Sequence, residues 1–316
     1  MGGLNRAAAL GLAALLCGSV AAEAGDPATC KAVRFSDVGW TDITSTTAMA
    51  SRLLQALGYE PKTELLAVPV TYEAMKNKDV DVFLGNWQPT MESIRKPYVD
   101  AKTVDLLETP NLTGAKYTLA VPTYTFDAGL KSFADIAKFK DQLDGKIYGI
   151  EPGNDGNKLI LDMIAKNTDG LKDFNLVESS EQGMLAEVDR ATRQKKPVVF
   201  LGWEPHPMNS KYDMKYLSGG DDVFGPDYGG ATVFTNTRAN YVSECPNAGA
   251  FIKNLKFTLP MENEVMGKIL FDKQEAPQAA EDWLKAHPDA WTAWLAGVTT
   301  FDGQPGLDAA KKSLGL

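Results

Sequence analysis

The stretch that decides the fold is residues 38–47, VGWTDITSTT. It follows an apolar run, Ala32–Phe35, which is typical of a buried strand. It precedes apolar residues at helical spacing, and Gly58 stands where a left-handed residue would end that helix. Trp40 and Asp42 therefore share one strand-to-helix loop.

This loop has the residue types of a binding site for an organic cation. In a parallel α/β sheet, such loops lie at the carboxyl ends of the strands, where ligands bind. Trp40 would offer a negative ring face and Asp42 a full negative charge, which together suit a soft cation. The structural alternative is that Trp40 closes the end of the sheet and Asp42 caps the helix.

A second pattern occurs twice in the chain. Residues 82–89, VFLGNWQP, and residues 199–205, VFLGWEP, differ by one inserted Asn and a Gln/Glu exchange. We interpret them as corresponding strands of two similar lobes, each of which delivers a tryptophan, Trp87 or Trp203, at its carboxyl end. The competing interpretation is that both tryptophans fill the cores of their lobes.

The remaining patterns alternate between strand and helix, which favours an α/β architecture with parallel strands. A crossing at 108–115 and a returning strand at 231–235 predict a discontinuous first lobe, residues 25–112 plus 213–316, and a second lobe, residues 113–212. Further strands are predicted at 65–68, 80–89, 117–122, 146–150 and 197–205, and helices at 72–77, 133–139, 158–167 and 182–194. An exposed loop is predicted at 219–230, and a mostly helical region after 246 in which Trp283, Trp291 and Trp294 belong to the core.

Composition narrows the class of protein. The 316 residues carry a net charge of −9, which argues against a nucleic-acid partner. With only two histidines and three cysteines, a metal site is poorly supported, and we expect neither a metal nor a cofactor.

The N-terminus resembles a secretory signal, and we assign residues 1–22 to it. Arg6 precedes a short apolar run, residues 7–16, and cleavage would follow Ala22 or Ala24. A lipid anchor at Cys17 is the alternative, but Leu16 is bulky where a small residue is usual. No later segment resembles a transmembrane helix, so we expect a periplasmic protein.

The mature chain keeps two cysteines, Cys30 and Cys245. In an oxidising compartment two cysteines most simply form one disulfide, which would join both ends of the discontinuous lobe. The alternative is a pair of free thiols.

Two lobes that meet with their strand ends facing would form one cleft. A quaternary ammonium suits aromatic walls there, because it donates no N–H bond and buries methyl surface against the rings. Neither tryptophan-bearing loop contains Arg or Lys, which favours choline over a betaine, whose carboxylate needs donors. Tyr117 could instead be ordinary strand filling, and Asn154 a turn former. The candidate lining is Trp40, Asp42 and Trp87 from the first lobe and Tyr117, Asn154 and Trp203 from the second.

On residues 39–44, 83–89 and 200–205, the chain resembles the periplasmic choline-binding proteins of bacterial ABC importers, within the glycine-betaine/quaternary-amine substrate-binding group. The resemblance implies a two-lobe clamshell, similar to the type II periplasmic binding proteins, with two crossing segments. It implies an aromatic box closed by Trp40, Trp87, Tyr117 and Trp203, with Asp42 and Asn154 as the polar partners of the choline hydroxyl. The resemblance to this family also extends to a disulfide between Cys30 and Cys245.

The resemblance implies a binding protein and not an enzyme, with choline as ligand and acetylcholine as a second candidate ligand. It also implies membrane permease subunits as partners and a monomeric state. The nearest alternative is a carrier of glycine betaine, carnitine or proline betaine. A glycan-acting enzyme could use tryptophan stacking and a carboxylate pair from Asp42, Glu151 and Glu204. A third possibility is a binding module that serves a chemoreceptor.

Overall fold

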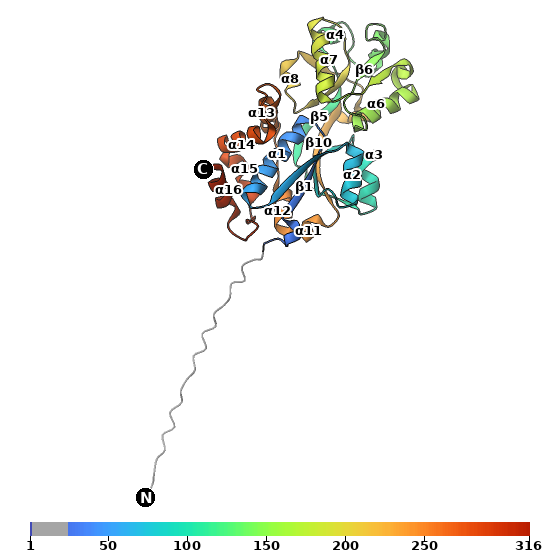
Figure 1. The fold of residues 1–316 in the computed structure, drawn as a ribbon. Helices are drawn as coiled ribbons and strands as arrows, with labels where there is room; N and C mark the ends of the chain where they lie inside the picture. Colours follow the sequence, from blue (N-terminus) through green and yellow to red (C-terminus); the bar gives the residue numbers. More distant parts are fainter. Residues whose placement is uncertain (2–24) are drawn as a thin grey trace.

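The computed structural model describes Met1 and residues 25–316, so residues 2–22 of the predicted signal peptide lie outside the described residues. Figure 1 shows two bodies, one above and to the right of the other. One sheet runs through both in the order β2-β1-β3-β10-β5-β8-β6-β7, with β4 beside β10 and β9 beside β5. The strands are β1 (Ala32–Asp37), β2 (Glu60–Leu65), β3 (Val82–Gln88), β4 (Val104–Leu106), β5 (Leu112–Pro122), β6 (Lys146–Tyr148), β7 (Asn175–Val177), β8 (Phe200–Glu204), β9 (Met214–Tyr216) and β10 (Gly230–Arg238).

Helices cover the sheet in both bodies. The first half holds β1–β4 with α1 (Thr41–Ala56), α2 (Val68–Lys76), α3 (Glu92–Asp100), α11 (Tyr241–Glu244), α12 (Pro246–Asn254), α13 (Leu259–Leu270), α14 (Ala276–Ala286), α15 (Pro288–Trp291) and α16 (Gly306–Leu314). The second half holds β5–β9 with α4 (Thr123–Asp127), α5 (Phe133–Ile136), α6 (Asp155–Lys166), α7 (Glu181–Arg193), α8 (Met208–Lys211), α9 (Asp221–Phe224) and α10 (Pro226–Gly229). Short 3-10 turns occur at Ala28–Cys30, Ala137–Phe139, Thr168–Asp173 and Thr292–Leu295.

The α/β class is confirmed, but the expectation of parallel strands holds only at the two flanks of the sheet. β1 pairs in parallel with β2 and β3, and β6 with β7 and β8. In the centre, β10 is antiparallel to β3 and β5, and β5 is antiparallel to β8. Two neighbouring parallel strands must be joined by a crossover connection. β5 and β10 instead carry the chain from one half to the other, so each of them enters the sheet from the end opposite to that of its neighbours.

Three predicted elements need correction. The second strand is β2, residues 60–65, and not residues 65–68, because it is a largely exposed edge strand without an apolar run. Val68 instead begins α2, where Pro69 is favoured in the first turn. The crossing at 108–115 is partly strand, since β5 begins at Leu112, and the loop at 219–230 contains α9 and α10.

The predicted lobe boundaries, residues 112/113 and 212/213, stay a prediction. The pairing of β9 with β5, in the register Ala120↔Tyr216, keeps the chain beside the second half after residue 213. This pairing indicates that the chain returns from the second half to the first later in the sequence than residue 213, at β10.

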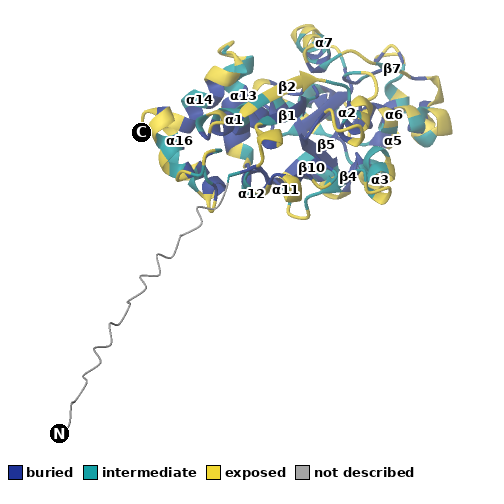
Figure 2. Ribbon diagram, turned by 60° about the horizontal axis from the view of Figure 1, so that its bottom comes forward, coloured by how far each residue is buried: buried dark blue, intermediate teal, exposed yellow. Residues whose placement is uncertain are grey.

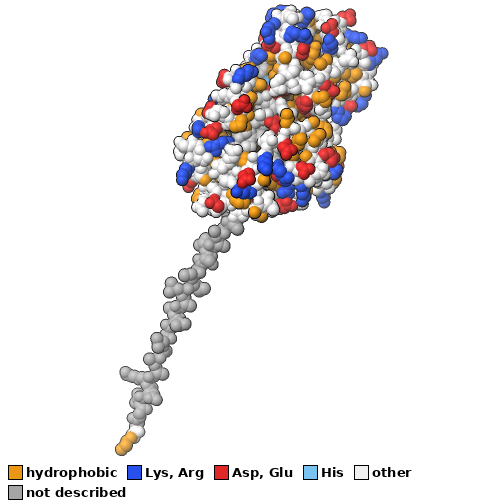
Figure 3. Space-filling model, in the orientation of Figure 1, with side chains coloured by type: hydrophobic (Ala, Val, Ile, Leu, Met, Phe, Trp, Pro, Cys, Tyr) orange, Lys and Arg blue, Asp and Glu red, His pale blue; other side chains and the backbone are white. Residues whose placement is uncertain are grey.

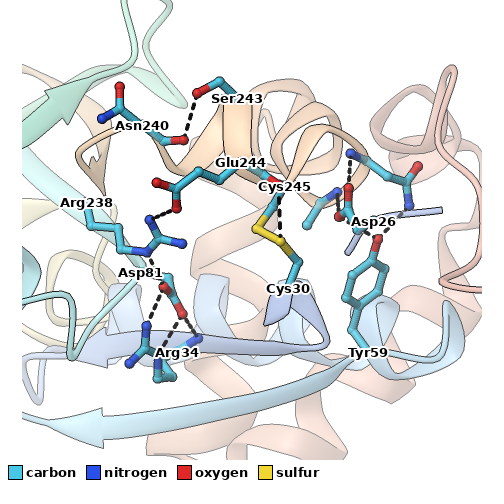
Figure 4. The surroundings of a disulfide bond; sticks show 12 residues. Asp26, Cys30, Arg34, Tyr59, Asp81, Arg238, Asn240, Ser243, Glu244 and Cys245 are labelled. Atoms are coloured by element: carbon cyan, nitrogen blue, oxygen red, sulfur yellow. Dashed lines mark hydrogen bonds and ion pairs between the residues drawn. A yellow bond between two sulfur atoms is a disulfide. The ribbon is translucent and has the colours of Figure 1, made fainter. Parts of the chain in front are cut away.

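The Cys30–Cys245 disulfide is present and lies at the base of the first half (Figure 4). Beside it, the buried Asp81 carboxylate accepts hydrogen bonds from Arg34 at 2.8 Å and from Arg238 at 2.7 Å. These contacts join β1 and the loop before β3 to the end of β10. The first half is therefore held together by contacts that join residues 30–34 and residue 81 to residues 238–245.

The core follows the sheet. In Figure 2 the central strands β1, β5 and β10 are coloured dark blue as buried, whereas α6, α7 and α16 carry exposed residues, coloured yellow. Trp283, Trp291 and Trp294 are 3%, 0% and 1% exposed, which confirms their place in the core. On the face in Figure 3, acidic and basic side chains are interspersed over both halves. Within residues 25–316, no helix has both the length and the apolarity of a membrane span.

Candidate functional site

A small cavity lies between the two halves. The structure brings all six predicted ligand-binding residues to its wall, together with two that the sequence did not suggest. The lining residues are Trp40, Asp42, Trp87, Tyr117, Ile150, Asn154, Asp155 and Trp203.

The first half presents its part of the wall from one loop and one strand end. Gly39 takes a φ of +83°, which lets the chain turn from β1 into α1. Asp37 secures this turn, because its carboxylate accepts the Gly39 N–H at 2.8 Å and the Thr44 hydroxyl at 2.7 Å. Trp40 and Asp42 are thereby placed at the N-terminus of α1, beside the end of β3.

The second half presents its part from neighbouring strands and a helix start. Tyr117 on β5 and Trp203 on β8 face each other in the antiparallel register. Asn154 caps α6: its Oδ1 accepts the Asn157 N–H at 3.0 Å and the Tyr117 hydroxyl at 2.9 Å. Gly156 is required here, since a Cβ at that position would lie 2.1 Å from the Tyr117 hydroxyl oxygen. The predicted helix at 158–167 thus begins earlier, at Asp155.

The rings meet edge to face and form walls around the space. Tyr117 lies 6.0 Å from Trp87 and 6.3 Å from Trp203, centroid to centroid, with interplanar angles of 62° and 87°. Edge-to-face contacts of this kind fix ring orientations. Tyr117 is therefore the central member that holds the two tryptophans in place.

Two carboxylates in the wall keep an oxygen without a partner among the described residues, Asp42 Oδ1 and Asp155 Oδ2. The other oxygen of Asp42 accepts Trp87 Nε1–H at 3.3 Å, and that of Asp155 accepts the Asn154 amide at 3.2 Å. Burial, followed by the charge of Glu181, raises the pKa of Asp42 well above its ordinary value. Burial raises the pKa of Asp155 to about 6.

No Lys or Arg belongs to the described wall of this cavity. A buried carboxylate needs compensation by a positive charge or by donors. Four rings, two under-coordinated carboxylates and no competing cationic side chain therefore suit a ligand that is itself a cation with an apolar surface.

Glu151 lies just outside the wall and links the two halves. Its Oε1 accepts the Trp40 Nε1–H at 2.9 Å, and burial raises the pKa of its carboxyl to about 7. Glu151 and Glu204 are both absent from the described cavity wall. The carboxylate pair that a glycan-acting enzyme would need is therefore not assembled from these residues.

Sequence reasoning missed Asp155 and Ile150. Asp155 could have been found, because it directly follows Asn154 at a helix start, where a carboxylate in the first turn is favoured. Ile150 carries no such signal, since an apolar residue that ends a strand is ordinary core.

Comparison with known proteins gives a consistent result. A family model described as the substrate-binding domain of the ABC-type glycine betaine transport system matches residues 31–286. The glycine betaine/carnitine transport binding protein GbuC of Listeria monocytogenes is 28% identical over 170 residues, which cover 52% of this chain and 53% of that protein.

Solved structures extend the similarity to the whole fold. An ABC-transporter choline-binding protein in complex with choline is 60% identical, with a TM-score of 0.90 over 92% of this chain and all of the other. Lactococcal OpuAC, in a closed form complexed with glycine betaine, is 29% identical, with a TM-score of 0.75 over 83% of this chain and 98% of its own.

Proposed function

The chain belongs to the family of substrate-binding domains of ABC-type glycine betaine transport systems, and we propose that it captures choline and delivers it to an ABC importer. The observation that carries the choice of ligand is the cavity wall, in which aromatic rings and two carboxylates meet without a cationic side chain. Family membership confirms the predicted two-lobe fold and the prediction of a binding protein.

In this proposal the rings of Trp40, Trp87, Tyr117 and Trp203 surround the trimethylammonium group. Each ring face adds about 0.5–2 kcal/mol of attraction while it buries methyl surface. Asp42 compensates the charge, and Asp42 or Asn154 accepts the hydrogen bond of the choline hydroxyl. Asp155 adds a second negative charge to the same wall.

A betaine would meet an unfavourable wall. Its carboxylate would approach Asp42 and Asp155, and like charges in a buried site repel strongly. A carboxylate also needs N–H donors, and the wall offers no Lys or Arg among the described residues. Glycine betaine, carnitine and proline betaine are therefore expected to bind more weakly than choline. Acetylcholine keeps the methylated head but carries an acetyl ester in place of the hydroxyl donor, so it is the natural second ligand to test.

Capture and delivery follow from the division of the wall between the two halves. An open form would take the cation on the rings of one half, and closure would bring the other rings, remove water and strengthen each electrostatic contact. A ligand shifts this equilibrium only through contacts that the closed form alone provides. The closed form is then the one that the permease subunits recognise.

The test is a titration of the purified protein by calorimetry with choline, acetylcholine, glycine betaine and carnitine in parallel. We expect a choline Kd in the micromolar range, which corresponds to about −8 kcal/mol, and glycine betaine at least about 100-fold weaker, because it adds like-charge repulsion. Equal or tighter binding of glycine betaine would contradict the choice of choline. Turnover of any bound compound would contradict a purely binding role.

Substrate-binding proteins of ABC importers act outside the cytoplasm. We infer further that this chain is exported to the periplasm by the signal at residues 1–22 and acts there as a monomer. N-terminal sequencing of the exported protein would identify the cleavage site, predicted after Ala22 or Ala24.

Closure without a ligand should depend on pH. Asp155 and Glu151 have raised pKa values, about 6 and about 7, because the closed form buries them. In an open form water would reach both groups and their pKa values would return towards the ordinary range, so the closed form binds more protons between about pH 4 and pH 7. Closure of the ligand-free protein is therefore favoured at low pH and becomes less favourable as pH rises through this window.

Small-angle scattering of the ligand-free protein at pH 5 and pH 7.5 checks this expectation. The radius of gyration should be smaller at pH 5, and Asp155→Asn should reduce the difference. A smaller radius at pH 7.5 would show that the sign is wrong.

A further inference from the structure

The helix that begins the binding loop takes its N-terminal cap from the other half of the protein. The residue before α1 makes no side-chain capping bond. The Glu181 carboxylate, on α7 of the second half, accepts the Thr41 N–H at 2.7 Å and the Thr41 hydroxyl at 2.5 Å. A first-turn N–H of a helix needs such an acceptor, and here it is 140 residues away in sequence. Figure 1 shows α1 and α7 in different bodies.

A histidine completes this contact. His206 Nδ1 accepts the Met208 N–H at 2.8 Å, so the ring hydrogen lies on Nε2, which donates to Glu181 Oε1 at 3.2 Å. The carboxylate therefore accepts three hydrogen bonds, two from the first half and one from its own half. Thr41, Glu181 and His206 are 3%, 1% and 1% exposed.

The contact joins the two segments that carry the aromatic walls. Thr41 stands between Trp40 and Asp42, both of which line the cavity. The His206 ring lies 4.7 Å from that of Trp203, centroid to centroid, at 70°. Glu181 thus connects the binding loop of the first half to the tryptophan of the second without lining the cavity itself.

We propose that Glu181 is the latch of the closed form, a positioning residue that holds the binding loop against the second half when ligand is bound. The two bonds from Thr41 cross between the halves and so exist only when the halves are together. In an open form, water would satisfy both partners. The latch therefore slows ligand release and contributes little to the first encounter. This inference rests on the proposed function, since it assumes that ligand binding and closure are coupled.

The test compares Glu181→Gln with Glu187→Gln, the same substitution on the same helix at a residue whose ion pair, among residues 25–316, is with Arg190. Thr41 donates to both oxygens of the Glu181 carboxylate. A glutamine removes the charge and replaces one of these oxygens by an NH2 group, so we expect the rate of choline release, measured by stopped-flow tryptophan fluorescence, to rise about 10- to 100-fold. The association rate should change less than about threefold. Glu187→Gln should leave both rates unchanged.

The melting temperature separates a latch from a general structural role. For the latch, ligand-free Glu181→Gln should melt as the wild type does, and only the choline-induced increase should shrink. Release rates equal to those of Glu187→Gln would overturn the proposal, and so would an equal loss of stability with and without choline.

A second measurement keeps the latch testable if choline is the wrong ligand. Spin labels at the exposed positions Lys62 and Lys166, one in each half, report the distance between the halves. With whichever of choline and glycine betaine binds the wild type, Glu181→Gln should leave a larger open fraction at saturation. Absence of choline binding to the wild type would contradict the proposed ligand, whereas unchanged distances in Glu181→Gln would contradict the latch.

Discussion

Asp42→Asn is expected to raise the Kd for choline about 100-fold, since a hydrogen bond or ion contact to a buried charge is worth about 1.5–3 kcal/mol. Asparagine keeps the shape of the side chain and can still accept the Trp87 Nε1–H, which lies 3.3 Å from the carboxylate. The substitution therefore removes the charge and little else. Glycine betaine should lose much less affinity, because the same change relieves its repulsion, so the preference for choline should fall.

Stability gives an independent check on this prediction. The pKa of Asp42 is raised well above its ordinary value by burial and by Glu181, so its charge costs free energy in the ligand-free closed form. Asp42→Asn should therefore melt at the same temperature as the wild type or higher. The matched control is Asp162→Asn on the exposed face of α6, which should change neither property. A choline Kd within threefold of the wild type would refute the assigned role.

Trp203→Ala should weaken choline binding about 100- to 1,000-fold, because truncation of a buried aromatic anchor costs roughly 3–4 kcal/mol. The ring is 4% exposed and forms the part of the wall that the second half brings on closure. It also supports Tyr117, 6.3 Å away. The loss should appear in affinity and in the extent of closure, measured by calorimetry and by small-angle scattering with saturating choline.

Two kinds of control separate the ring face from its volume and from general stability. Trp203→Phe keeps a ring and should lose about tenfold, whereas Trp203→Leu fills space without a π face and should resemble alanine. Trp294→Phe alters a buried tryptophan far from the cavity wall, so it should lower the melting temperature and leave the choline Kd unchanged. Equal affinity of the Leu and Phe variants would exclude a cation–π role for this wall.

The sequence was most informative where local periodicity and turn chemistry act. The passage from β1 through Gly39 into α1, and the end of α1 before Gly58, follow from alternating apolar residues and from glycines with positive φ. The strands that end in Trp87 and Trp203 were recognisable from their repeated pattern. Each of these features depends only on neighbouring residues.

The errors arose where an element takes its stability from partners elsewhere. β2 is an edge strand with a polar, exposed pattern, so no apolar run indicates it, and its pairing with β1 decides its limits. The antiparallel centre of the sheet depends on where β5 and β10 cross between the halves. Asp155 became part of the candidate site only through the packing of α6 against Tyr117.

By itself, the sequence determined the kind of protein, an α/β chain whose strand ends carry aromatic rings and one acid, because residue type and periodicity are local properties of the sequence. Only the tertiary structure decided how the rings close on one space, which further acid joins them, and that Glu181 caps α1 from the opposite half. These features are contacts between residues that lie from 30 to 140 positions apart, and their geometry depends on how the two halves come together.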